Sequence, residues 1–446
     1  MLRPGITALT LACLVEVARA NPASTVPSAA DPGNAIDLHL SIDYAYELAQ
    51  ATLFREQLSP SNDPLGPLPE ARELDFKQSR HVITPRAELA IYNDTWLWAA
   101  LPIIVAQERE LTLADGATRD GLSTIADGLL PAQGFDARDG GGATAGNLLF
   151  RGASRSGLDQ VYLGLGIAPM SQKRDPTKPT WKLGAELRLA VGRVMRFDAL
   201  APAKETGVGR GVHELRLMTS VGKRFARSEG WFEMFWQTPL IEKEASLFGD
   251  PGFGSTNTQL GQIAGASFGG EIYALADRVN HNYISFDFGA SVIAHFEGRD
   301  YSEMWEVFAL AGDSRGGGPL ILDRDPTMMG VQPLSHPGIS NIENYLENVA
   351  RFAVRAQLGQ HVRFSLGVNL VWKTDHIISF ADAGVDLPTC GGGVSSACEN
   401  DVNDLVNPNT REVNPVAAPR IDLVGHRYHS ENNFGVVFGL QGQVLW

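Results

Sequence analysis

The sequence predicts an all-β protein, a transmembrane antiparallel up-and-down β-barrel of about twelve strands. Apolar and polar side chains alternate along many segments, short and long connections alternate, and the last segment keeps one apolar face up to Trp446. Successive side chains of a strand point to opposite faces, so this alternation indicates strands with one apolar and one polar face. In a membrane barrel, lipid contacts the apolar face and the polar face lines an enclosed lumen.

The first twenty residues have the pattern of a secretory signal peptide. Arg3 precedes an apolar stretch, and Ala18, Arg19 and Ala20 form a small-x-small cleavage site. We therefore expect residues 1–20 to be removed, residues 21–35 to form an N-terminal periplasmic segment and residues 36–446 to form the barrel. An even number of strands would leave both termini in the periplasm and the barrel in the bacterial outer membrane.

Charge and hydropathy exclude other classes. The formal net charge is −14, whereas nucleic-acid binding needs clustered Lys and Arg, so we expect no nucleic-acid partner. The best apolar window of the mature chain, residues 96–106, is interrupted by Pro102 and is shorter than the ~20 residues of a spanning helix. We expect no cofactor and no metal.

The two end strands show the alternation best. Residues 37–48 place Leu38, Leu40 and Ile42 on one face, and residues 434–446 run from Phe434 to Trp446 with apolar residues on one face. A last strand of this kind resembles the insertion signal of outer-membrane barrels, so we expect it to contact lipid and the barrel-assembly machinery. The ten strands predicted between them cover 80–92, 95–112, 158–170, 180–192, 212–226, 230–240, 258–275, 283–297, 346–358 and 362–381.

The connections predict which end of the barrel is which. Short turns fall at 93–94, 171–179, 227–229, 276–282 and 359–361, and long loops at 49–79, 113–157, 193–211, 241–257, 298–345 and 382–433. Short periplasmic turns and long external loops are typical of outer-membrane barrels. Several aromatic residues near the short turns, including Trp96, Trp98, Trp181 and Trp231, predict an interfacial belt.

The loop 298–345 has helical features. Residues 301–310 have helical spacing of apolar side chains, and a second helix is expected to begin at Ser340, where Glu343 completes a capping pattern. These helices either fold inward as a plug or cover the outer mouth, and we favour the cover. In the loop 382–433, Cys390 and Cys398 are expected to form a disulfide.

The polar faces predict a lumen that carries both charge signs. Such residues either form a polar track for a solute or form salt bridges that fill the interior of the barrel. The lumen-lining candidates are Arg86, Glu88, Glu186, Arg188, Glu214, Arg216, Asp287, Arg355, Arg363 and Lys373.

Catalytic and metal-binding patterns are weak. Ser291 and His295 share a face, and His426 and His429 lie close together, but neither pair completes a catalytic triad or a zinc site. The acidic segment 400–409 departs from the spacing of a calcium-binding loop. We therefore expect no enzyme activity, with a barrel lipid hydrolase as the least favoured alternative.

Two blocks of the sequence resemble a known family. Residues 85–105 (PRAELAIYNDTWLWAALPIIV), and the run from Arg155 to Asp159 with the strands that follow it, resemble putative outer-membrane transporters named for the phenol meta-degradation pathway. The resemblance covers roughly residues 80–240, and this chain lacks the second glycine expected after Leu158. It implies a barrel that takes up small hydrophobic or aromatic compounds.

The resulting expectation is a channel or transporter for passive passage of small molecules. A structural or surface-binding barrel with a plugged lumen is the alternative. Polar faces and predicted barrel size favour the channel, because twelve strands enclose more space than a packed eight-strand barrel and less than a sixteen-strand porin.

Overall fold

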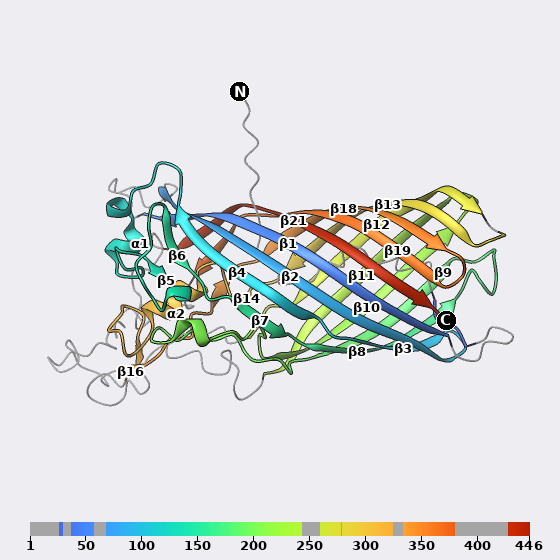
Figure 1. The fold of residues 1–446 in the computed structure, drawn as a ribbon, viewed down its shortest axis with the longest axis horizontal. Helices are drawn as coiled ribbons and strands as arrows, with labels where there is room; N and C mark the ends of the chain where they lie inside the picture. Colours follow the sequence, from blue (N-terminus) through green and yellow to red (C-terminus); the bar gives the residue numbers. More distant parts are fainter. Residues whose placement is uncertain are drawn as a thin grey trace, which may run out of the picture.

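The computed structural model describes residues 26–29, 37–57, 68–242, 259–277, 279–323, 333–379 and 427–446. Twelve antiparallel strand positions form one closed barrel, because the first strand pairs with the second on one side and with the last on the other (Figure 1). This confirms the predicted all-β, twelve-strand barrel. Neither α-helix in the described residues is long and apolar enough to cross a lipid bilayer.

The strands of the wall lie close to the predicted ranges. In ring order they are β1 (Leu38–Glu56), β2 (Glu70–Tyr92), β3 (Thr95–Ala100) with β4 (Ile103–Leu113), β7 (Arg155–Leu158) with β8 (Val161–Met170), β9 (Thr180–Leu189), β10 (Val212–Arg224), β11 (Ser228–Glu242), β12 (Ile263–Asp277), β13 (Asn282–His295), β18 (Tyr345–Leu358), β19 (Val362–Lys373) and β21 (Tyr428–Leu445).

The connections contain smaller elements. They are the strands β5 (Phe135–Asp136), β6 (Leu148–Arg151), β14 (Gly298–Asp300), β15 (Leu322–Asp323), β16 (Pro333–Leu334), β17 (Ser340–Ile342) and β20 (His376–Ser379), the helices α1 (Ser123–Ala126) and α2 (Trp305–Ala311), and the 3-10 helices η1 (Arg119–Gly121), η2 (Ala137–Asp139) and η3 (Pro202–Lys204).

The two faces of the wall differ in polarity. Outward side chains are apolar and exposed, as at Ile42 and Leu366, each 62% exposed, whereas their chain neighbours Ser41 and Ser365 point inward and are buried. Large apolar side chains exposed all around a closed wall are stable only in contact with lipid. The barrel is therefore a membrane-spanning one.

The two ends of the barrel also differ. The short-turn end holds the two-residue turn Asn93–Asp94 and the chain end, where the Leu38 amide donates to the Trp446 carbonyl at 3.1 Å. The loop end, at the left of Figure 1, holds α1, α2 and the strands β5 and β6.

The strands predicted at 95–112 and 362–381 are each interrupted, the second after Lys373, where β19 ends before β20 begins at His376. Residues 95–112 form β3 and β4, which share one position in the ring and are separated by Leu101 and Pro102. Proline has no N–H to donate to a neighbouring strand, so the ladder breaks there. Strands β1 and β2 also extend farther toward the loop end than predicted. The alternation did not predict this extension, because the consecutive residues Ala51, Thr52 and Leu53 are all buried.

The loop end is closed by a hydrophobic core. Met304, Val307 and Phe308 of the α2 segment pack with the inward side chains of the wall and with the loop 113–157. The wall contributes Leu53 and Phe76, which occupy inward register positions. The α2 segment therefore folds into the mouth and does not lie over it as predicted, and the helix predicted within residues 301–310 is confirmed.

The helix expected at Ser340 is also wrong. Ser340 begins strand β17, which pairs with β14 on one side and β20 on the other. Ser340 pairs within a short sheet instead, and the Glu343 amide that follows β17 donates to the Ile377 carbonyl at 3.1 Å, so neighbouring segments satisfy these backbone groups.

Part of the predicted aromatic belt lies inside the barrel. Trp96, Trp98 and Trp231 are buried and share the inward register, whereas Trp181 faces outward. A Cβ atom at Gly164 would overlap the Trp98 indole ring, so glycine on β8 makes room for the tryptophan on β3. These indole rings fill the lumen near the short-turn end and do not contact lipid.

Candidate functional site

The ten sequence-predicted lumen residues all occupy inward register positions. Arg86, Glu88, Glu186, Arg188, Glu214 and Arg216 lie on β2, β9 and β10, and Asp287, Arg355, Arg363 and Lys373 lie on β13, β18 and β19. The structure thus divides them into two groups on separate sectors of the wall.

Two ion pairs in the first group join residues two apart on one strand. Arg86 Nε lies 2.7 Å from Glu88 Oε1, and Arg188 Nε lies 2.9 Å from Glu186 Oε1. The Trp98 indole N–H donates to Glu186 at 2.9 Å, and the Arg86 guanidinium lies 5.3 Å from the Trp98 ring. A planar guanidinium against an aromatic face adds a cation–π attraction to the ion pair.

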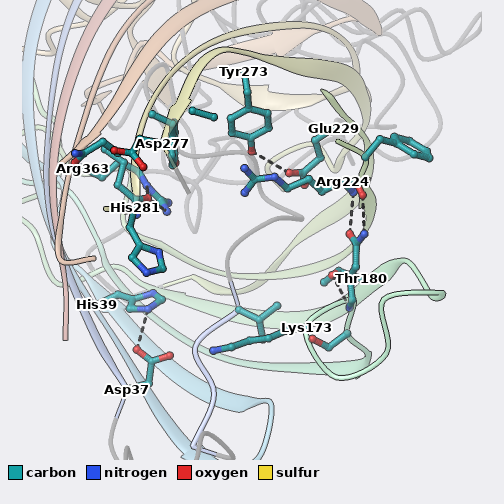
Figure 2. Close-up of a pocket in the computed structure, with 18 residues that line it drawn as sticks. Asp37, His39, Lys173, Thr180, Arg224, Glu229, Tyr273, Asp277, His281 and Arg363 are labelled. Atoms are coloured by element: carbon teal, nitrogen blue, oxygen red, sulfur yellow. Dashed lines mark hydrogen bonds and ion pairs between the residues drawn. The ribbon is translucent and has the colours of Figure 1, made fainter. Parts of the chain in front are cut away.

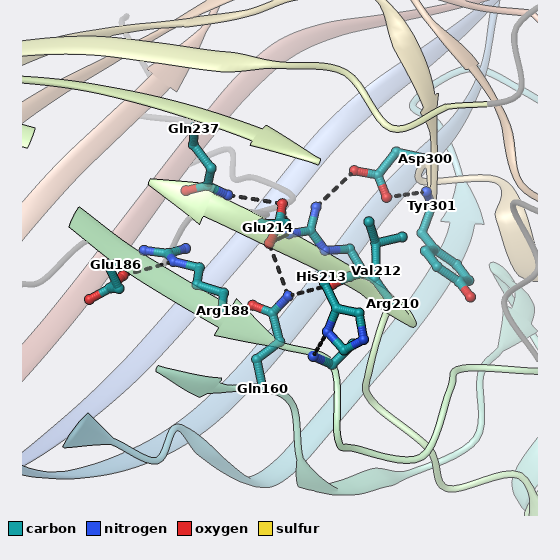
Figure 3. Close-up of polar contacts among 11 residues, drawn as sticks. Gln160, Glu186, Arg188, Arg210, Val212, His213, Glu214, Gln237, Asp300 and Tyr301 are labelled. Atoms are coloured by element: carbon teal, nitrogen blue, oxygen red, sulfur yellow. Dashed lines mark hydrogen bonds and ion pairs between the residues drawn. The ribbon is translucent and has the colours of Figure 1, made fainter. Parts of the chain in front are cut away.

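Glu214, also in the first group, is the centre of a separate hydrogen-bond network (Figure 3). Arg210 donates to both of its carboxylate oxygens at 3.0 Å, and Gln160 and Gln237 donate to it at 2.9 and 3.0 Å. Arg210 also lies 3.4 Å from Asp300 Oδ2. Because Arg210 belongs to the loop 193–211 and Asp300 to the loop 298–345, this network connects two loops to the wall.

The second group centres on Asp287 and Arg355. Asp287 forms ion pairs with Arg355 and, at 3.2 Å, with Arg351, and Arg355 Nη1 lies 2.9 Å from Glu271 Oε2. Asp287, Arg355 and Glu271 are almost completely buried, so their charges are stabilised by one another rather than by bulk water. Arg363 bonds to Gln357 and Gln443, and Lys373 to Tyr345.

A cavity of about 720 Å³ occupies the short-turn end of the lumen (Figure 2). His39 lies 3.0 Å from Asp37, and Arg224 covers the Tyr273 ring at 3.9 Å. The described N-terminal residues 26–29 enter this region, since the Ser28 amide donates to Asp37 at 2.9 Å and Val26 lines the cavity. The lumen therefore has a wide polar chamber at this end.

At the loop end, α2 is held by arginines of the wall. Arg155 Nη2 on β7 lies 2.8 Å from Glu306 Oε1, and its guanidinium lies 4.9 Å from the Trp305 ring. Arg109 on β4 donates to the Ser302 carbonyl at 3.0 Å. Neither arginine belongs to a local charge pattern that predicts a site, although Arg155 begins one of the blocks that carry the family resemblance.

Two further contacts in the loops depend on the protonation of carboxyl groups and of a buried histidine. The Arg315 guanidinium lies 2.6 Å from Asp313 and 2.7 Å from Asp198, and it holds the pKa of both carboxyl groups below their ordinary value. Burial and, secondarily, Arg299 lower the pKa of His336 well below 6.5. His336 Nδ1 accepts from the Gly338 amide at 2.9 Å, as a neutral imidazole does.

The candidate catalytic and metal-binding residues are dispersed. Ser291 bonds to Ser267 at 2.8 Å, while His295 lies 3.6 Å from Glu347 and stacks on Tyr345. In the parts of the chain that the structure describes, one group with metal-ligand geometry is found, formed by Glu70, His429 and Glu431. The disulfide candidate Cys390 and Cys398, His426 and the segment 400–409 lie outside the described residues.

Comparisons with known proteins return structural likenesses only. No protein-family model matches this chain, and no curated protein matches it. The resemblance to the phenol-degradation transporters therefore stays a prediction.

Among solved structures, an outer-membrane channel from Pseudomonas putida F1 is 9% identical, with a TM-score of 0.39 and 93% of this chain and 99% of that chain covered. A Pseudomonas aeruginosa FadL homologue is 10% identical, with a TM-score of 0.33 and 92% and 90% covered. The Escherichia coli outer-membrane protease OmpT is 6% identical, with a TM-score of 0.28 and 92% and 96% covered. These values assign no function to this chain.

The architecture itself defines the class of protein. An even-numbered, closed antiparallel barrel has an apolar outer wall, polar charges inside, short turns at one end and long loops at the other. These are the features of a bacterial outer-membrane β-barrel. The protein is an outer-membrane barrel whose lumen is the candidate functional site.

Proposed function

We propose that this barrel is an outer-membrane channel that lets small molecules pass through its lumen. The observation that carries the proposal is the closed wall around a charged lumen, with a cavity of about 720 Å³ at the short-turn end. The hydrophobic core at the loop end makes passage depend on movement of residues 301–311, the α2 segment. We propose that this segment is the gate.

The lining of the lumen supports small aromatic or amphipathic solutes. Arg216 covers the Phe235 ring at 3.9 Å, Arg224 covers Tyr273 at 3.9 Å, and Arg351 lies 4.7 Å from Trp231. A solute with a flat apolar ring and a polar group can stack on such pairs and also bond to a guanidinium. These pairs of an arginine and an aromatic ring therefore support the uptake of aromatic compounds, which the family resemblance also implies.

The channel is tested by conductance of the purified barrel in planar bilayers. We expect discrete conductance steps, and a barrel that shows neither steps nor solute flux contradicts the proposal. The solute class is tested by swelling of proteoliposomes in phenylalanine and in cyclohexylalanine, two zwitterions of similar size. Faster swelling with phenylalanine supports aromatic stacking in the lumen, and equal rates contradict it.

A plugged, surface-binding barrel is the second candidate. The core around Met304, Val307 and Phe308, which fills the mouth, is the observation that favours it. In that case the original barrel shows no conductance steps, and deleting residues 300–340 abolishes partner binding. A gate instead predicts conductance steps in the original chain, because a gate opens and closes while it is present.

A further inference from the structure

A groove of about 450 Å³ lies at the loop end, next to the outward face of β1, β2, β4 and β21. Two rows of paired residues form its floor. One runs from Phe434 through Gln50 and Lys77 to Glu110, and the other from Val436 through Leu48 and Ser79 to Glu108. All eight side chains are on the outward register, so the groove faces the surroundings of the barrel.

The groove begins where the apolar band of the wall ends. On β1 the outward residues Leu40, Ile42 and Tyr44 are exposed and apolar or aromatic, and the series becomes polar at Gln50. Just below the groove, Tyr46 stacks on His81 with ring centroids 4.5 Å apart, and the Tyr44 hydroxyl lies 2.8 Å from His81 Nδ1.

Aromatic rings with polar ends mark the boundary between hydrocarbon and headgroups. From Tyr46 to Gln50 is four residues, and a strand that rises ~3.3 Å per residue at a tilt of about 40° climbs roughly 10 Å over that length. The groove therefore lies at the level of the lipid headgroups, with Leu48, Phe434 and Val436 on the side of the acyl chains.

Four cations line the groove, and one of them, Arg109, turns inward to the Ser302 carbonyl. Lys77 is exposed on its floor, and Arg138 and Arg151 line it from the loop 113–157. Asp136 positions both arginines, since it accepts from the Arg138 amide at 2.9 Å and from Arg151 Nη1 at 2.9 Å. Arg138 also lies 3.2 Å from Glu108.

The donors and acceptors of the groove match one kind of headgroup. Lys and Arg bind phosphate oxygens through charge-assisted hydrogen bonds. Glu108, Glu110 and Gln50 provide acceptors for hydroxyl groups, which a lipid phosphate alone lacks and a sugar supplies. The apolar side chains at the lower edge continue into the lipid-facing band, where acyl chains pack.

We propose that this groove binds the phosphorylated sugar headgroup of a glycolipid in the leaflet around the loop end. Lys77 and Arg138 contact the phosphate, and the neighbouring carboxylates accept hydrogen bonds from the sugar. The site lies outside the barrel, so it is independent of any conduction through the lumen. Bound lipid would hold the loop 113–157 against the wall through Arg138 and Arg151.

The test uses the full-length barrel in dodecyl maltoside micelles and diphosphoryl lipid A as the probe. Native mass spectrometry measures the bound fraction against lipid concentration. The test variant is the double substitution Lys77→Ala with Arg138→Ala, and the matched control is Lys178→Ala, an exposed cation in the turn 171–179. Lys77→Arg keeps the charge. The mobility of unheated samples on gels verifies that every variant is folded.

We expect the double variant to bind lipid A at least ten-fold more weakly, while Lys178→Ala and Lys77→Arg bind like the original chain. Phosphatidic acid, which has a phosphate and no headgroup hydroxyl, should displace lipid A poorly. Three results overturn the proposal: unchanged binding by the folded double variant, an equal loss with Lys178→Ala, or equally effective displacement by phosphatidic acid.

Discussion

Arg155 of β7 and Glu306 of α2 form an ion pair with a distance of 2.8 Å, and both side chains are almost completely buried. The pair connects the wall of the barrel to the helix that fills its mouth. Removing one partner leaves an uncompensated buried charge, which typically costs about 3–5 kcal/mol. The stability of the closed mouth should therefore depend on this contact.

The first prediction concerns Glu306→Gln, which keeps the shape of the side chain and removes its charge. We expect more frequent openings and a higher mean conductance in planar bilayers, because Arg155 no longer holds α2. The control is Glu205→Gln, which removes the surface pair of Glu205 with Arg193 at 3.4 Å. An unchanged open probability for Glu306→Gln means that α2 is not the gate.

The second prediction concerns Trp98, which packs in the lumen and donates to Glu186. Trp98→Ala should widen the lumen near the short-turn end, so larger neutral sugars should enter proteoliposomes. The loss of packing should also cost about 3–5 kcal/mol of unfolding free energy. Trp181→Ala, on the outward face, removes a ring of the same size and should leave the size limit unchanged.

The third prediction concerns pH. The pKa of buried His336 lies below its unfolded value of 6.5, so its stabilising effect is complete above pH 6.5 and is lost as the pH falls. Each pH unit below 6.5 removes up to about 1.4 kcal/mol, until the folded-state pKa is reached. The pKa values of Asp198 and Asp313 are also lowered, so protonating them at still lower pH removes their pairing with Arg315.

Acidification from pH 7.5 to pH 5 should therefore loosen the loop 298–345. Limited proteolysis of the folded barrel measures this as faster cleavage within the loop. His336→Asn retains an acceptor for the Gly338 amide and should remove most of the change between pH 6.5 and 5. His281→Asn, at the exposed short-turn end, should behave like the original chain. Equal pH dependence in both variants would exclude His336 as the sensor.

The fourth prediction compares two exposed leucines. Leu366 is 62% exposed on the outer wall, and Leu200 is 72% exposed in the loop 193–211. Leu366→Arg should destabilise the barrel in lipid vesicles by about 2–4 kcal/mol, since a charge near mid-bilayer is costly. Leu200→Arg should change the unfolding free energy by less than about 0.5 kcal/mol. Denaturant unfolding measures both, and equal values would contradict the proposed lipid contact.

The sequence predicted the strands because the two faces of the wall contact different solvents. Ile42 and Ser41 differ in polarity for that reason, and the alternation can be read without a structure. The alternation disappears at residues 49–56, where the loop-end core covers the inner face and adjacent residues such as Ala51 and Thr52 are both buried. Trp96 and Trp98 were misplaced because residues 95–112 begin with apolar side chains on both faces.

Six of the ten lumen candidates were found as charged pairs two residues apart, which share a face, and the other four from the polar face of an alternating strand. The contacts that close the mouth could not be found in this way. Arg155 and Glu306 are 151 positions apart in the chain and lie in or beside long loops. No local period connects them, since their meeting depends on how the loop 298–345 folds back into the barrel.

The pairing of β1 with β21 closes the wall, so the chain termini could lie between any two neighbouring strands. Leu38 and Trp446 exchange backbone hydrogen bonds at 3.1 and 2.9 Å, so a short peptide can join these strands. A circular permutant that is joined there and opened at the turn 359–361 would keep every inter-strand partner. The order in which the strands are synthesised would change, while the finished cylinder would not.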